Sequence, residues 1–143
     1  MLRCAGFLVL LCGLLVSGAP LVCAAEQEHE GSPQPQTATL GPDGVQRATI
    51  VLDSYRYEPA YLIVLSNRPV ELTLTSVTTL TPHNFVLNEG GLALNVDVSA
   101  GKTVVLKFSP PPIGTFAFYC DKQLLFFKSH REKGMEGRLE VRP

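Results

Sequence analysis

Short runs of β-branched and aromatic residues, separated by turn residues, fill the chain from Gln46 to its end. The run Val70-Glu71-Leu72-Thr73-Leu74-Thr75 alternates apolar and polar residues, as in a strand with one buried face and one face in water. No part of this region has the period of a long, capped helix. The pattern predicts an all-β fold, a Greek-key β-sandwich of about eight strands. The expected strands are Ala48–Asp53, Tyr61–Ser66, Val70–Ser76, Asn84–Asn88, Leu92–Val98, Thr103–Phe108, Thr115–Tyr119 and Arg138–Arg142.

The first 25 residues have the pattern of a secretory signal peptide. Arg3 precedes an apolar run at 7–16 that is short for a membrane span, and small residues offer cleavage after Ala25. We therefore expect an exported protein, periplasmic or otherwise extracytoplasmic, with no membrane span after cleavage. A lipid anchor on Cys23 is the less favoured alternative, because Val22 is large for the residue before a lipid-modified cysteine.

Residues 26–45 are rich in Glu, Gln, Pro, Ser and Gly and contain almost no large apolar residue. This composition predicts a flexible polar linker that leads into one domain at 46–143. Cleavage of the signal peptide removes Arg3 and changes the formal net charge from −1 to −2. Non-specific nucleic-acid binding requires a strongly basic surface, so we expect no nucleic-acid partner. We also expect a monomer.

Cys120 is the one cysteine beyond the first 23 residues. Cysteines in oxidising compartments usually pair, so a single cysteine forms an intermolecular disulfide, packs as an inert apolar residue or is kept for chemistry. His130 and Met135 follow Cys120, and Met135 is the only methionine after the initiator. The residues after Cys120 therefore favour a chemical role.

The domain contains a second histidine, His83, and with it the ligand types of a mononuclear copper site. Such sites use two imidazoles, a thiolate and a distant thioether. Each residue also has a simpler interpretation: His83 as a hydrogen-bonded strand end, His130 as part of a charged loop and Met135 as a core residue. We expect His29, between two glutamates in the linker, to be solvated. The candidate metal ligands are therefore His83, Cys120, His130 and Met135.

Several sequence blocks occur in the same order as in a known family: Tyr55-Arg56-Tyr57-Glu58-Pro59, Pro82-His83-Asn84-Phe85, the run from Gly114 to Cys120, and His130 with Gly134-Met135-Glu136-Gly137. With these blocks the segment 54–141 resembles a cupredoxin, the family of plastocyanin and azurin. The resemblance implies one copper ion, cycling between Cu(I) and Cu(II), with His83, Cys120 and His130 as equatorial ligands and Met135 as the axial ligand. It also implies that Asn84 ties the two ligand-bearing loops together.

Nine residues separate Cys120 from His130, whereas small cupredoxins have about two to four there. A longer loop is similar to the type 1 site of copper nitrite reductases. It could strengthen the bond to Met135, distort the site or admit a carboxylate such as Glu132.

The long loop contains the apolar run Leu124-Leu125-Phe126-Phe127. Two interpretations are open: the run shields the copper from water, or it presents a docking face near His130. Basic residues surround it, namely Lys122, Lys128, Arg131 and Lys133. They indicate either a basic rim for an acidic redox partner or charges that serve solubility alone.

The function predicted from these features is that of an exported one-electron carrier with a type 1 copper site, which is not an enzyme. A binuclear copper centre needs two bridging thiolates, and no oxyanion-hole motif accompanies Cys120. The alternative is a copper-handling protein, for delivery, storage or sensing, that uses the same four ligands. A metal-free sandwich used for interaction is a third interpretation.

Overall fold

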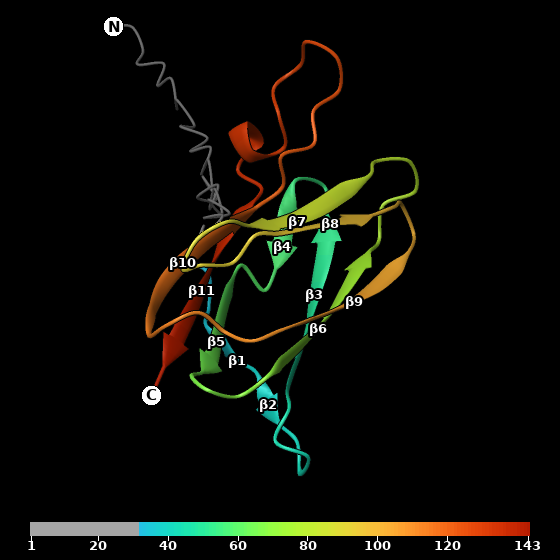
Figure 1. Cartoon of the computed structure of the whole chain (residues 1–143). Coiled ribbons are helices and arrows are strands. Elements are labelled where there is room, and N and C mark those ends of the chain that lie inside the picture. Colours follow the sequence, from blue (N-terminus) through green and yellow to red (C-terminus); the bar gives the residue numbers. More distant parts are fainter. Residues whose placement is uncertain (1–31) are drawn as a thin grey trace, which may run out of the picture. The chain divides into compact units, whose positions relative to one another are not determined.

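The computed structural model describes residues 32–143, which form two β-sheets that make a sandwich (Figure 1). The described residues hold eleven strands: β1 Gln36–Thr37, β2 Thr39–Leu40, β3 Gln46–Asp53, β4 Arg56–Glu58, β5 Tyr61–Leu65, β6 Val70–Ser76, β7 His83–Leu87, β8 Leu94–Val98, β9 Thr103–Phe108, β10 Gly114–Tyr119 and β11 Glu136–Arg142. A single 3₁₀ turn, η1 at Arg131–Lys133, is the one helix among these residues. No helix in the described part has the length and hydrophobicity to cross a membrane.

One sheet has the strand order β1-β5-β11-β10-β7-β8, and the other has the order β2-β3-β6-β9, with β4 paired to β3. β11 lies between β10, to which it is antiparallel, and β5, to which it is parallel. β10 in turn pairs with β7, the strand that begins at His83. The C-terminal end of β10 and the beginnings of β7 and β11 therefore lie at the same end of this sheet.

Alternation along the strands fills the space between the sheets. In β6 the side chains of Val70, Leu72 and Leu74 are buried while the residues between them are half-buried. This period of two places one face of each strand in the core. Near the beginning of β7 the core contains an aromatic pair, in which Phe118 stacks on Phe85 with ring centroids 4.9 Å apart.

The predicted all-β sandwich is confirmed, and each of the eight expected strands is present with ends within two residues of those predicted. Three further short strands, β1, β2 and β4, were not expected. β1 and β2 lie inside the segment expected to be a linker, where β1 pairs with β5 and β2 with β3. Backbone hydrogen bonds to longer strands hold these residues, although their composition is polar. The expected signal peptide at 1–25 lies outside the described residues, as does the start of the linker.

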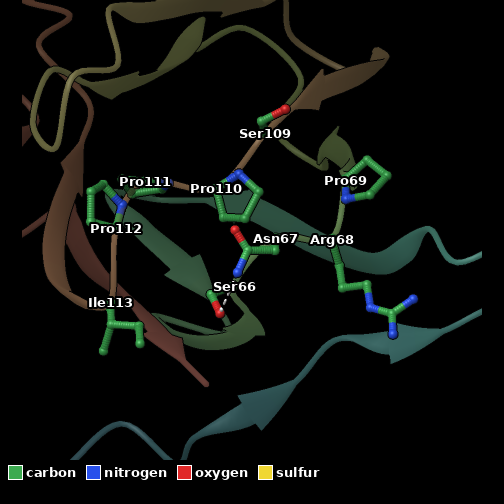
Figure 2. A pocket seen from close by; sticks show the side chains of 9 residues that line it. All are labelled: Ser66, Asn67, Arg68, Pro69, Ser109, Pro110, Pro111, Pro112 and Ile113. Carbon is green, nitrogen blue, oxygen red and sulfur yellow. Dashed lines mark hydrogen bonds between the residues drawn. The ribbon is translucent and has the colours of Figure 1, made fainter.

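A cavity of about 660 Å³ lies at the end of the sandwich remote from the start of β7 (Figure 2). It is lined by the β5–β6 turn at 66–69 and by the connection between β9 and β10 at 109–113. Its lining offers no imidazole, thiol or carboxylate. The candidate metal ligands all belong to the opposite end.

Candidate metal centre

His83 is the first residue of β7, and strand alternation turns it toward the core together with Phe85 and Leu87. Its side chain is fully buried. Neither ring nitrogen of His83 has a hydrogen-bond partner among residues 32–143. A buried polar group without a partner costs about 1–3 kcal/mol. The imidazole is therefore free to offer a ring nitrogen to a metal ion.

Cys120 follows β10 directly and continues the inward-facing side of Phe118. The Cys120 N–H donates to the carbonyl of Met135 at 3.1 Å, which extends the β10–β11 pairing by one residue. The Asn84 N–H approaches Cys120 Sγ at 3.5 Å. The thiol is fully buried and forms no disulfide within the described part of the chain.

His130 and Met135 are held on one tight turn. The Met135 N–H donates to the His130 carbonyl at 2.9 Å, and η1 lies between the two residues. Gly134 ends η1 with φ 94°, a left-handed conformation that favours glycine, and its N–H donates to Arg131 O. This reversal returns the chain to the site, and the Met135 side chain is fully buried.

The potential ligand atoms of His83, Cys120 and His130 all lie within 4.8 Å of one another. The Cys120 Sγ and His130 Nδ1 atoms are 3.3 Å apart. The structure thus brings together the three nitrogen and sulfur donors predicted from the sequence. The backbone of Met135 is hydrogen-bonded to the backbones of Cys120 and His130. Two imidazoles and a thiol with a neighbouring thioether form a donor set that suits copper.

Burial shifts the titration of all three donors. Desolvation lowers the pKa of His83 to about 4, with a smaller contribution from His130, and it also lowers the pKa of His130. Burial raises the pKa of the Cys120 thiol. At neutral pH both imidazoles are therefore uncharged, as metal ligands must be, and metal binding must displace the thiol proton.

Asn84 connects two segments that carry candidate ligands, as the family resemblance implied. Its Nδ2 donates to Asp121 Oδ1 at 2.7 Å, and the Asp121 N–H donates back to Asn84 Oδ1 at 3.1 Å. Nδ2 also donates to Asn95 Oδ1 at 2.9 Å. These bonds fix the residue after His83 to the residue after Cys120.

Two tyrosines belong to the surroundings of the site and were not predicted from the sequence. The Tyr57 hydroxyl, which is buried, donates to the Asn84 carbonyl at 2.6 Å. The edge of Tyr55 meets His130 with ring centroids 4.8 Å apart, and Lys133 Nζ lies 4.1 Å above the Tyr55 ring. Tyr55 has φ 71° on the turn between β3 and β4. Both tyrosines lie in the block 55–59, but that block carries no signal for these contacts.

His130 is the more accessible of the two histidines, at 6% exposure against 0% for His83. It lines a cavity of about 330 Å³ together with Tyr55, Leu80, Leu124 and other residues. His130 therefore lies nearer the surface than His83, although its ring is largely covered.

The structure resolves two questions about the long loop between Cys120 and His130. Glu132 is exposed, and its carboxylate accepts hydrogen bonds from the N–H and hydroxyl of Ser129 at 2.7 and 2.8 Å. Its carboxylate is thus engaged at the surface and not among the clustered donors. Leu125 and Phe126 are exposed and do not line the cavity beside His130, so they do not shield the site, whereas Leu124 and Phe127 do line it.

The chain belongs to the cupredoxin family, because the family model of the Cupredoxin-like domain matches residues 14–135. This match confirms the resemblance inferred from the sequence blocks. No curated protein has a significantly similar sequence.

Several solved structures share the fold at low sequence identity. The metal-binding domain of the Cu(I)-exporting P-type ATPase CopA of Streptococcus pneumoniae has a TM-score of 0.59 and 21% identity, covering 79% of this chain and 100% of that chain. Auracyanin of Roseiflexus castenholzii has a TM-score of 0.57 and 20% identity, covering 68% and 97%. Auracyanin A of Chloroflexus aurantiacus, a blue copper protein, has a TM-score of 0.51 and 17% identity, covering 67% and 99%.

Proposed function

We propose that this protein binds one copper ion through His83, Cys120, His130 and Met135 and carries single electrons between redox partners. One observation carries the proposal: the two ring nitrogens of buried His83 have no partner among the residues that the structure describes, and they lie beside the Cys120 thiol and a second imidazole. When bound, copper would supply the one-electron Cu(I)/Cu(II) couple. The copper-binding proteins among the solved structures of this fold support this choice of metal.

The donor set favours copper over zinc. Zinc accepts thiolate and imidazole well, but it is a poor partner for the thioether of methionine. In a zinc site the thioether of Met135 would be only a weak ligand, whereas a distant methionine is usual at copper in electron-transfer proteins.

The chain's own residues would hold one geometry for both oxidation states. The donors come from a strand start, a strand end and a turn, and backbone hydrogen bonds link Cys120 to Met135 and Met135 to His130. The burial of all four side chains excludes water. A rigid, dry donor set keeps the rearrangement between the two states small. Electrons would enter and leave through His130, which lines the same cavity as Tyr55.

We place this carrier outside the cytoplasm, as a monomer and not an enzyme, with a redox protein as its partner. The expected signal peptide supports export, and the basic residues near His130 support a partner that is acidic at the contact.

A second candidate function is copper handling, in which the protein delivers, stores or senses copper. The nine-residue loop between Cys120 and His130, with its exposed tip, favours it, because a long loop could open to release the metal. The fold is compatible, since the metal-binding domain of a Cu(I) exporter shares it. A carrier should keep copper in both oxidation states and exchange electrons rapidly, whereas a copper-delivery protein should transfer Cu(I) readily to an acceptor.

The test is to add Cu(II) to the purified protein and record the visible spectrum beside a Cys120→Ala control. An intense thiolate-to-copper band in the wild type, absent from the control, is the expected result. Met135→Leu should keep the band and raise the reduction potential, because the axial ligand tunes the potential. A wild-type protein without the band would refute the type 1 site, and loss of copper from Met135→Leu would refute the axial role.

A further inference from the structure

Four consecutive large apolar residues at the tip of the long loop remain largely exposed, although two of them line the cavity beside His130. These residues, Leu124, Leu125, Phe126 and Phe127, form what we call the apolar tip, and they are 68%, 74%, 87% and 55% exposed. Single exposed apolar residues are ordinary, but a contiguous group marks an interaction site. The tip therefore needs something to cover it.

The apolar tip is a projection with its own hydrogen bonds. The His130 N–H donates to Lys122 O at 2.8 Å and closes the base of the loop. The Phe127 N–H donates to Leu124 O at 3.0 Å and closes the turn, and Gln123 Nε2 donates to Phe127 O at 2.7 Å. In Figure 1 the segment between β10 and η1 extends beyond the ends of the strands. The tip is thus presented as a preformed knob.

Positive charge surrounds the base of this knob. The segment 121–133 has four cationic and two acidic side chains, a net charge of +2: Lys122, Lys128, Arg131 and Lys133 against Asp121 and Glu132. Lys128 and Lys133 form no ion pair with any described residue, and both are exposed. The two carboxylates are already engaged by Asn84 and Ser129. The free charge next to the tip is therefore cationic.

We propose that the apolar tip inserts into the interface of an anionic lipid bilayer, with Lys128 and Lys133 at the level of the phosphates. Apolar side chains gain free energy at the boundary of headgroups and acyl chains, and basic residues add attraction to anionic lipid. Lysine suits this border because its ammonium group remains in water while its stem lies along apolar surface. A narrow projecting knob with a cationic base fits a deformable lipid surface better than the flat face of a protein.

Insertion would bring His130 close to the membrane surface, because its backbone closes the base of the loop. The proposal does not depend on copper, so it and the proposed function can fail separately.

The chain contains no tryptophan, which allows a direct test. Phe126→Trp introduces a single reporter at the tip, in protein obtained by expression of the full chain. On addition of vesicles of equal parts phosphatidylcholine and phosphatidylglycerol, its emission should shift to the blue and be quenched by brominated lipid. Ile113→Trp is the matched control, because Ile113 is 62% exposed at the opposite end of the sandwich and its reporter should not respond.

Two sets of variants separate the apolar and the charged contributions. Leu125→Ser with Phe126→Ser should lower the vesicle partition coefficient about tenfold or more, because two buried side chains are lost from the interface. Lys128→Gln and Lys133→Gln should each lower it about fivefold on anionic vesicles and leave it unchanged on pure phosphatidylcholine. All variants carry the same amino terminus, so any contribution from it cancels, and unfolding midpoints verify that they fold.

Two results would overturn the proposal. If the reporter at position 126 keeps its emission in the presence of anionic vesicles, the tip does not enter lipid and takes a protein partner instead. If the emission shifts with protein concentration and without vesicles, a second copy of the chain covers the tip.

Discussion

Replacement of Asn84 by alanine should lower the free energy of unfolding by about 3 kcal/mol. The Asn84 side chain is buried and takes part in three hydrogen bonds, two with Asp121 and one with Asn95. Each contributes about 1 kcal/mol on average, and a bond to a carboxylate contributes more. The substitution removes all three and leaves the Asp121 N–H without its acceptor. Urea unfolding of the metal-free protein measures the loss, with the slope of the unfolding free energy against urea concentration unchanged.

Asn95→Ala is the matched control, because it removes only the bond of 2.9 Å to Asn84 and should cost about 1 kcal/mol. Asn84→Asp replaces the donor that faces Asp121 Oδ1 by a second carboxylate oxygen, and it should destabilise the protein at neutral pH at least as much as Asn84→Ala. Equal stabilities of Asn84→Ala and Asn95→Ala would refute the reasoning, since Asn84 would then not tie the two segments together.

The same substitution bears on copper, if the proposed site is correct. Asp121 adjoins Cys120, so loss of its bonds to Asn84 frees the segment that positions the thiol. Removal of a residue that orients metal ligands lowers metal affinity about 10- to 100-fold. Competition with a copper chelator measures the change, and an unaltered affinity would show that the thiol is held by other contacts.

Three further predictions concern stability. Gly137→Ala should cost about 2 kcal/mol or more in thermal unfolding, because its Cβ would overlap the buried ring of Phe118; a neutral effect would mean that the ring can move. Tyr57→Phe should cost about 1 kcal/mol by loss of the 2.6 Å bond to the Asn84 carbonyl, and an unchanged urea midpoint would contradict this. In metal-free protein, burial lowers the pKa of His83 from 6.5 to about 4, so the unfolded chain binds a proton that the folded chain excludes. The contribution of neutral His83 to the free energy of unfolding should be fully present above pH 6.5. It should fall toward pH 4 by at most about 1.4 kcal/mol per pH unit. A urea midpoint that does not change between pH 6.5 and pH 4 would count against this prediction.

Strands with strong alternation were predicted well, and short polar strands were not. β6 at Val70–Ser76 matches its prediction at both ends, because burial of one face requires a period of two in the sequence. β1 and β2 consist of Gln, Thr and Leu residues that are exposed. What makes them strands is the backbone hydrogen bonding offered by β5 and β3, which leaves no mark on their own composition.

The ligand types followed from the sequence because they are scarce: one thiol, one thioether and two imidazoles in the predicted domain. Scarcity says nothing about distance. That His83, Cys120 and His130 place their donors within 4.8 Å depends on the pairing of β10 with both β7 and β11.

The sequence by itself determined the fold class, the family and the candidate ligands, because periodicity and residue type are local properties. Only the tertiary structure decided that Tyr55 covers His130, that Glu132 is bound to Ser129 and that the apolar tip projects into solvent. The sequence of the tip is equally compatible with a shield over the metal and with a docking surface. The direction in which the apolar tip points depends on which backbone groups close the loop. The hydrogen bond from the His130 N–H to the Lys122 carbonyl closes it, and the side chains of these two residues do not predict that bond.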